Sequence, residues 1–589
     1  MSVVICQLSF DPVNTLANLD IKPQTPRKAS KQNSNKMSSA RGNIPVSASD
    51  ASLASTLESV EWKEKLKLAG NVVLPRPPND KLKVSYLSTN KALVALCVFL
   101  STSAFITGII LFMYGTNNWW YWIFAFISVF ASMVTYFIVI ILGRGFDYDF
   151  HDAVIKEVRD NTEDPFAPSV DILLPVCGED LSVLHNTWTH VSKVRHNGEL
   201  KVYILDDSNS SDVKELAGFF GFNYLVRDNR PYMKKAGNLR SAFTKTSGEF
   251  FVIFDADFCP RPDFLEETLG RMKSDPTIAI VQTPQFFEQR EEQNYVEKGA
   301  GAVQELFYRL IQPARNSART SLFSKYKPAY GAICVGSCAI YRRAALEPFG
   351  GTAEVEHSED VRTGFMATSA GYHVEYAPLN LATGVCPTTQ RAFFSQQYRW
   401  ASGSTTLGTS KVFWQTKLGA VRRISYMSGM MFYLTSLMSI VTGPIISQVL
   451  IWAYPTMILY YNISFAIPGL ILIQLLLPIW SAQLWPFSAF FSLASQNWAY
   501  TWAIKDRLLG TVGQWSPTGN VGKKSQMSIK FRNARIAAFM VVFGSWASMF
   551  TGAFLQIFLW NRIEWFNVLP MMAISSLHNV MYIPFIFNI

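Results

Sequence analysis

Long apolar stretches lie on both sides of a more polar middle region of the chain. They lie at 92–115, 119–143, about 427–453, 457–483, 534–560 and 566–588. A helix that crosses a bilayer needs roughly 20 apolar residues. The pattern therefore predicts about six transmembrane helices: a hairpin at 92–143, two helices at 427–483 and two at 534–588.

A further apolar stretch, at 486–504, is shorter and more polar than the others. If it crossed the membrane, the seven Lys and Arg residues between 505 and 535 would lie outside, against the tendency of positive charges to stay in the cytosol. We therefore expect an amphipathic helix on the inner membrane surface at 486–508. A cytosolic loop at 509–533 would follow it.

The first two apolar stretches are joined by a short link, Thr-Asn-Asn-Trp-Trp, without Lys or Arg, whereas Lys83, Lys91 and Arg144 flank the pair. The positive-inside tendency puts the tip of this hairpin outside and both of its ends in the cytosol. Residues 1–85 are rich in Ser, Asn, Lys and Pro and show little periodicity. We interpret them as a disordered cytosolic tail.

The middle region, 144–420, holds short apolar runs that end in acidic or turn residues. Examples are VDILLPV, LKVYILDD, GEFFVIFDAD and TIAIVQTP. Such runs are typical of buried parallel strands, and the segments between them of crossover helices. We expect a doubly wound α/β domain, whose ligands bind at the carboxyl ends of the strands, with interfacial helices near its end.

Composition agrees with this division of the chain. Only 16% of the residues are charged, against roughly 25% in an ordinary soluble domain. The net charge of +10 fits positive inner loops better than nucleic-acid binding. The seven cysteines show neither a disulfide framework nor zinc-ligand spacing.

Acidic residues form three clusters: Asp206 with Asp207 and Asp255 with Asp257 follow predicted strands, and Glu359 with Asp360 begins a predicted helix. Each cluster alone also fits turn or helix-cap residues. In Asp-Ala-Asp, however, alternate residues of an extended segment point the same way. Two carboxylates on one side suit Mg²⁺ or Mn²⁺, which would neutralise a departing diphosphate.

Two basic segments complete the candidate chemistry. Lys235, in KKAGNLR, suits phosphate neutralisation but also an exposed helix start. In SQQYRWASG, Arg399 suits bidentate binding of a diphosphate, Trp400 an apolar face for a sugar ring, and Gln396 a hydrogen bond to either. The alternative is an Arg that reaches from the bilayer beside an interfacial Trp.

The order Asp-Asp, Asp-Ala-Asp, Ser-Glu-Asp and Gln-x-x-Arg-Trp, between membrane helices, resembles the processive family 2 glycosyltransferases. These include cellulose synthases, mixed-linkage glucan synthase-like proteins, chitin synthases and hyaluronan synthases. KAGN and QTPQFF are most similar to the cellulose synthase branch. The resemblance implies a GT-A-type cytosolic domain at 144–420, inserted in a polytopic helical bundle.

The resemblance also implies roles for matching positions. Asp360 would be the general base, and Asp255 and Asp257 would bind the metal. The donor would be bound by Pro175, Glu179, Asp206, Asp207, Lys235, Asp255, Gln396 and Arg399. The acceptor and the channel entrance would be contacted by Trp400 and by Val335, Gly336 and Ser337 of ICVGSC.

Three features depart from the cellulose synthase pattern. Phe258 follows Asp-Ala-Asp where that branch usually has His, and Val335 replaces a usual Cys. The segment GTVGQWSPTGN at 510–520 replaces the usual Phe-x-Val-Thr-x-Lys. We expect its Gln514, Trp515, Ser516 and Thr518 to belong to a mobile loop that closes over the donor; an ordinary turn is the alternative.

The sequence thus predicts a processive, inverting enzyme that polymerises glucose from UDP-glucose into cellulose or a mixed β-1,3/β-1,4-glucan and translocates it. Alternatives are a chitin or hyaluronan-type synthase that uses UDP-N-acetylglucosamine, and a non-catalytic nucleotide-binding receptor or transporter. The expected partners are the UDP-sugar, the growing glucan and the lipid bilayer; a homo-oligomer is possible, and nucleic acid is not expected. We expect a multi-pass protein of the plasma membrane, with the Golgi as alternative.

Overall fold

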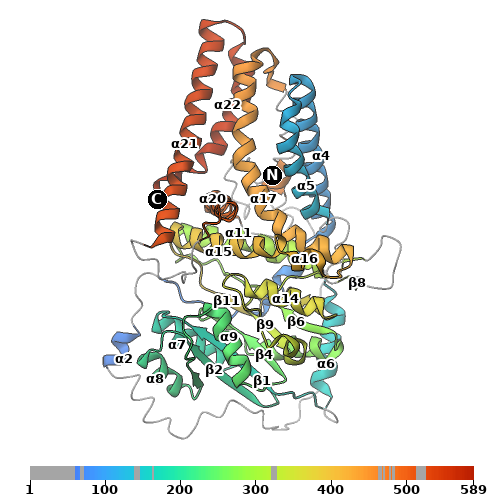
Figure 1. Cartoon of the computed structure of the whole chain (residues 1–589), viewed down its shortest axis with the longest axis vertical. Coiled ribbons are helices and arrows are strands. Elements are labelled where there is room, and N and C mark those ends of the chain that lie inside the picture. Colours follow the sequence, from blue (N-terminus) through green and yellow to red (C-terminus); the bar gives the residue numbers. More distant parts are fainter. Residues whose placement is uncertain are drawn as a thin grey trace, which may run out of the picture.

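The computed structural model describes residues 60–66, 72–137, 146–161, 165–316, 318–319, 328–329, 331–461, 467, 471–476, 479, 485–512 and 525–589. Figure 1 shows three levels along the long axis of the molecule. A sheet domain lies at one end, long helices lie at the other, and helices that run across the long axis lie between them.

The sheet domain is built on seven strands in the order β10-β6-β9-β4-β1-β2-β3. They are β1 (Val170–Val176), β2 (Leu200–Asp206), β3 (Asn223–Leu225), β4 (Phe250–Ile253), β6 (Ile278–Gln282), β9 (Ala339–Arg342) and β10 (His373–Tyr376). Two small pairs accompany them: β5 (Phe258–Pro260) with β11 (Ala382–Gly384), and β7 (Ala318–Arg319) with β8 (Pro328–Ala329). The four apolar runs singled out in the sequence are β1, β2, β4 and β6.

One strand differs from the all-parallel prediction, because β9 runs antiparallel to both β4 and β6. Its residues directly follow the ICVGSC segment. The consequence is functional: ICVGSC is held at the edge of the sheet where β4 and β6 end.

Successive residues of the central strands point to opposite sides of the sheet. Ile172 and Leu174 of β1 lie in one buried apolar cluster with Val252 of β4. Leu173 and its neighbour Ile253 belong to the cluster on the other side. This two-sided burial explains why the strands appear in the sequence as continuous apolar runs.

Helices connect the strands and cover the sheet. They are α6 (Tyr148–Asp160), α7 (Leu181–Val191), α8 (Ser211–Phe219), α9 (Lys234–Lys245), α10 (Phe264–Ser274), α13 (Arg343–Leu346) and α14 (Glu359–Ser369). The predicted α/β domain is therefore confirmed, with a mixed rather than an all-parallel sheet.

A layer of helices separates the sheet from the long helices (Figure 1). It contains α11 (Tyr295–Leu306), α12 (Gln312–Asn316), α15 (Gln390–Gly408), α16 (Lys411–Gln415) and α20 (Ser488–Leu508). α15 and α20 bond through buried side chains: Gln397 Oε1 accepts from Gln496 Nε2 at 2.9 Å and from the Tyr500 hydroxyl at 2.7 Å. α20, which Figure 1 shows end-on, lies across the long helices. Its position on a membrane surface remains a prediction.

Four helices in the described part of the chain are long and apolar enough to cross a membrane. They cover Ala92–Thr116, Ala420–Ala453, Gln526–Leu559 and Trp565–Phe587, within α4 (Lys91–Thr116), α17 (Ala420–Ala453), α21 (Gln526–Phe554) with the turn that follows it, and α22 (Trp565–Val580) with α23 (Ile583–Phe587). α5 (Trp122–Phe137) contains a shorter apolar helix, and most of 457–483 lies outside the described residues. The number six thus remains a prediction.

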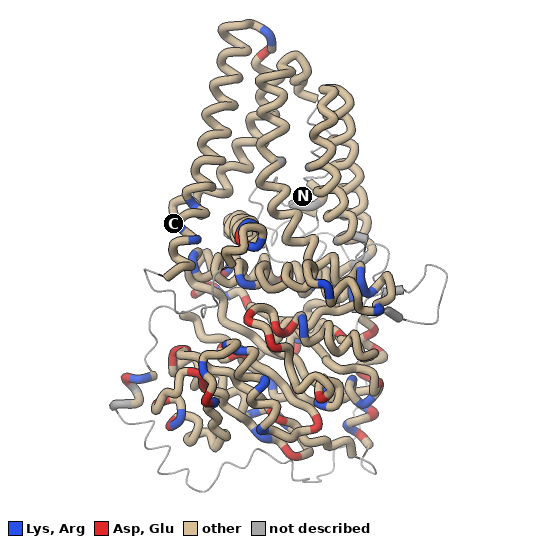
Figure 2. The backbone as a smooth tube through the Cα atoms, viewed as in Figure 1, with Lys and Arg blue, Asp and Glu red and all other residues tan. Residues whose placement is uncertain are grey.

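Charged residues are distributed unevenly along the molecule. Figure 2 shows almost none on the long helices, apart from the loop between α21 and α22. Lys and Arg gather where these helices meet the layer beneath them. This is the distribution that a helix bundle in a bilayer requires.

The predicted disordered tail is too long, because residues 72–85 are folded against the sheet domain. Backbone carbonyls of this Pro-rich stretch accept hydrogen bonds from the domain: Leu74 from Arg290, Pro75 from Asn186 and Pro78 from Arg261. Proline lacks a donor but keeps its acceptor. Such an extended segment therefore shows no periodicity and is fixed only by tertiary contacts. Of the remaining tail, the structure describes 60–66, with a short helix α2 (Val60–Lys65).

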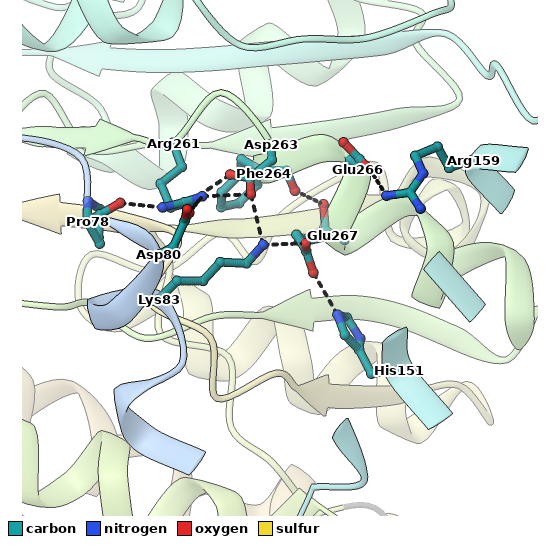
Figure 3. Close-up of polar contacts among 11 residues, drawn as sticks. Pro78, Asp80, Lys83, His151, Arg159, Arg261, Asp263, Phe264, Glu266 and Glu267 are labelled. Atoms are coloured by element: carbon teal, nitrogen blue, oxygen red, sulfur yellow. Dashed lines mark hydrogen bonds and ion pairs between the residues drawn. The ribbon is translucent and has the colours of Figure 1, made fainter. Parts of the chain in front are cut away.

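Lys83, at the end of α3 (Asp80–Lys83), extends this attachment (Figure 3). Its Nζ donates to Asp263 at 2.8 Å and to Glu267 of α10 at 2.5 Å. The other oxygen of Glu267 lies 2.8 Å from His151 of α6. The segments that precede and follow the predicted hairpin are thus joined to one helix of the sheet domain.

Candidate active site

Four segments meet at the end of β4. The carboxylate of Asp255 pairs with Nζ of Lys235, which comes from α9. The same Nζ lies 3.4 Å from the carbonyl oxygen of Gly336 and 3.9 Å from Glu359 Oε1 at the start of α14. The Asp255 backbone N–H donates to the Ser337 hydroxyl at 2.9 Å. These four segments, all singled out in the sequence, therefore lie next to one another, with Lys235 and Asp255 at the centre.

Asp257 shares this negative environment. Burial and the nearby Asp255 carboxylate raise the pKa of Asp257 to about 7. Phe258 stands where the cellulose synthase branch usually has His, and its side chain is buried in the core. Its ring lies against Gly384. The centroids of the Phe258 and Phe287 rings are 5.7 Å apart, and the two rings meet edge-on.

Asp360 lies in the first turn of α14, against the ICVGSC segment. Gly336 has φ +80°, and a Cβ placed on it would lie 2.8 Å from both Cβ and Oδ2 of Asp360. Oδ1 accepts from the Val361 backbone N–H at 2.7 Å. Burial and the neighbouring Glu359 carboxylate raise the pKa of Asp360 to about 7, which suits a group that takes up a proton near neutrality.

Arg399 approaches the same acidic residues from α15. Burial lowers the pKa of Arg399 to about 10, while Asp255 and Glu359 act in the opposite direction. Lys235 responds differently: burial lowers its pKa, but Asp255 and Glu359 outweigh burial and raise it. Gln396 and Trp400, also on α15, are half-buried. Arg399 thus lies beside the acidic cluster.

Asp206 has the turn contacts that were its alternative interpretation, whereas Asp207 pairs with an arginine distant in the sequence. Asp206 is fully buried and accepts from Ser208, from the Ser210 N–H and from the Tyr224 hydroxyl. Asp207 forms a bidentate pair with Arg227, at 2.7 and 2.6 Å. Arg227 also donates to the carbonyls of 232 and 234, next to Lys235. In the structure these two carboxylates organise the loops that precede Lys235.

Pro175 and Glu179 lie at the carboxyl end of β1. Pro175 comes after the last residue pair between β1 and β4, which is Leu173 with Ile253, so its missing N–H removes no hydrogen bond on that side. Glu179 accepts from the Cys177 N–H at 2.6 Å, and burial raises its pKa.

Two glutamines that the sequence argument did not assign hold the ICVGSC segment in place. Gln282 accepts from the Val335 N–H at 2.8 Å and donates to the Ser337 carbonyl at 2.7 Å. Gln285 donates to the Val335 carbonyl at 3.0 Å. Both belong to QTPQFF, where a buried amide directly after an apolar strand was the available signal. Gln514, Trp515, Ser516 and Thr518 lie outside the described residues.

Comparison with known proteins places this site in a family. Residues 250–493 match glycosyl transferase family group 2, and the match includes Asp255, Asp257, Asp360 and Arg399. The chain therefore contains a glycosyltransferase family 2 domain, and the family prediction is confirmed.

Among curated proteins, the chain is similar to cellulose synthases. The chain is 32% identical to the UDP-forming cellulose synthase catalytic subunit of Pseudomonas fluorescens (strain SBW25) over 246 residues, 41% of this chain and 32% of that one. It is 31% identical to cellulose synthase 2 of Novacetimonas hansenii over 311 residues, 50% of this chain and 18% of that one. The chain thus spans a third or less of the length of these relatives. Among solved structures, a mannosyltransferase of Pyrobaculum calidifontis aligns with TM-score 0.43 and 15% identity, covering 66% of this chain and 100% of that one.

Proposed function

We propose that the protein is a membrane-embedded, processive, inverting β-glycosyltransferase. It transfers glucose from UDP-glucose to a β-1,4-linked glucan, either cellulose or a mixed β-1,3/β-1,4-glucan, and passes the product across the membrane. The observation that carries this proposal is the placement of Asp360 against Gly336, beside the Lys235–Asp255 pair and Arg399. A base, a diphosphate-neutralising cluster and an acceptor segment thus meet at one point.

The reaction assigns a separate task to each group. Asp360 accepts the proton of an acceptor hydroxyl as this oxygen attacks the anomeric carbon from the face opposite UDP. Lys235 and Arg399 offset the charge that develops on the departing diphosphate. The contacts of Lys235 with Asp255 and Glu359, and the attraction of the same carboxylates for Arg399, favour these positions of both cations before the donor binds.

Asp255 and Asp257 would hold Mg²⁺ or Mn²⁺. Their oxygen donors suit either ion, and a bound cation would favour the charged form of Asp257, which burial and the nearby Asp255 carboxylate disfavour. Among the described residues, no group of three or more His, Cys, Asp or Glu side chains is arranged to hold a metal. The remaining ligands would therefore be donor phosphates and water, as is usual for Mg²⁺. When bound, the ion would supply charge neutralisation at the diphosphate.

The helix bundle provides the path for the product. α15 carries Arg399 and Trp400 and lies directly beneath the long helices (Figure 1). Trp400 contacts the acceptor sugar where the glucan enters the bundle, and the sheet domain faces the cytosol. In support, the curated relatives are named as UDP-forming cellulose synthases, and the described helices include four candidate spans.

A donor screen tests the proposal. Membranes that contain the protein are incubated with radiolabelled UDP-glucose or UDP-N-acetylglucosamine and with Mg²⁺ or Mn²⁺. We expect high-mass product from UDP-glucose only, degraded by cellulase or by a mixed-linkage glucanase. Incorporation from UDP-N-acetylglucosamine would assign the chitin or hyaluronan class instead, and UDP release without polymer would exclude processivity.

A further inference from the structure

The helix that carries Arg399 touches the turn that carries Asp360 at one glycine. Gly403 lies four residues after Arg399 in α15, so the two residues share one helix face. A Cβ placed on Gly403 would overlap the Ser358 hydroxyl and would lie 2.5 Å from Ser358 Cβ and 2.9 Å from the His357 carbonyl carbon. Any side chain at position 403 would therefore displace either the turn or the helix.

Ser358 occupies a constrained position in that turn. It precedes α14 with φ 52° and ψ 49°, the left-handed conformation, which is unfavourable for a residue with a side chain. Two residues later the chain reaches Asp360. A shift of Ser358 is therefore passed directly to the first turn of α14.

Asp360 is confined on a second side as well. Gly336 lies so close that a Cβ there would be 2.8 Å from Asp360 Cβ. The acidic turn thus lies between two glycines, Gly336 of the ICVGSC segment and Gly403 of α15. Two elements far apart in sequence define the position of one carboxylate.

We propose that Gly403 is a positioning residue, whose close contact with Ser358 sets the position of Asp360 relative to Arg399 and to the acceptor sugar. The inference rests on the proposed function, because it assumes that Asp360 is the base. Because α15 is bonded to α20 through Gln397, the Ser358 turn is the part that yields to a larger residue.

The same helix supplies a matched control. A Cβ on Gly408, the last residue of α15, would meet only Sδ, Cε and Cγ of Met430, a flexible side chain. Gly403→Ala and Gly408→Ala therefore make the same chemical change in one helix. Only the first meets a backbone and a constrained turn.

The test compares donor turnover in the full-length protein. For Gly403→Ala we expect kcat to fall about 100-fold, the effect of a misplacement of about 1 Å, with the KM for UDP-glucose nearly unchanged. Gly408→Ala is expected to retain wild-type kcat. The double variant Gly403→Ala/Ser358→Gly should recover part of the loss, since glycine removes the overlapping side chain and tolerates a positive φ, while the close approach to the His357 carbonyl carbon remains.

Each outcome has one meaning. Wild-type kcat in Gly403→Ala, an equal loss in Gly408→Ala, or a loss that Ser358→Gly does not recover would overturn the positioning role. If Gly403→Ala fails to accumulate, recovery of folded, active protein in the double variant supports the contact, and its absence overturns it. An inactive wild-type protein counts against the proposed function instead.

Discussion

At the scale of single residues, the carboxyl group of Asp360 has a property that a proton acceptor needs. Burial and Glu359 disfavour its charged form and raise its pKa to about 7. A base works only when deprotonated, so the active fraction is lost as the pH falls through this value. We expect kcat/KM to decrease about tenfold per pH unit below about 6 and to level off above about 8. A pH–rate profile checks this, and a rate that stays constant down to pH 5 would contradict it.

Removal of the same carboxylate separates chemistry from binding. Asp360→Asn preserves the shape of the side chain but cannot accept the proton, so we expect transfer to fall by about 10²–10⁴-fold. The affinity for UDP, measured by calorimetry, should change little, since Lys235 and Arg399 are untouched. Retained polymer synthesis would exclude Asp360 as the base.

Some candidate site residues could be predicted from the sequence, whereas some contacts between residues could not. Asp255, Asp257 and Asp360 were singled out because acidic residues follow buried strands or open a helix. The engagement of Asp207 by Arg227 could not be predicted, because 20 residues separate them. The contact is made only when the segment after β3 folds back.

At the scale of elements, three helices are held together by one buried carboxylate. Asp506 of α20 accepts from the Tyr398 hydroxyl of α15 at 2.7 Å and pairs with Lys505 and with Lys530 of α21. Burial opposes the charged form, but these hydrogen bonds hold the pKa of Asp506 below its usual value. Tyr398 is adjacent to Arg399 in the sequence, so this network fixes the helix that carries Arg399.

Loss of one partner should weaken this junction. Lys530→Met leaves Asp506 buried with fewer donors, and we expect a destabilisation of about 2 kcal/mol, seen as a lower midpoint of thermal unfolding in detergent. Arg532→Met removes an equal charge from an exposed position of the same helix and serves as control. Equal midpoints for the two variants would mean that Lys530 contributes nothing to the junction.

At the scale of the whole molecule, the charge pattern predicts an orientation. The link between the first two spans carries no Lys or Arg, and basic residues gather below the bundle (Figure 2). We expect a cysteine at the exposed Asn117 to react with an impermeant maleimide on intact cells, and one at Lys201, whose side chain is 42% exposed, only after permeabilisation. The parent protein gives the background, since five of its six described cysteines are buried and Cys177 is half-buried. Labelling of Lys201→Cys on intact cells would mean that the orientation in the membrane is the opposite of the predicted one.

By itself the sequence determined the long apolar helices, the α/β domain and its family, and it singled out the candidate acidic and basic site residues. These follow from local patterns: runs of apolar residues long enough for a bilayer, buried strands that end in carboxylates, and motifs in a set order. The periodicity of apolar residues indicates only which face of a segment is buried, not which other segment covers it.

Only the tertiary structure decided how these parts meet. The antiparallel course of β9, the attachment of residues 72–85 and the contact of Gly403 with Ser358 all depend on segments distant in the chain. The physical reason is that close packing and hydrogen-bond pairing between such segments leave no periodic trace in either one. SQQYRWASG illustrates both sides: its Arg399 could be recognised from the sequence, whereas the contact made by its final glycine required the fold.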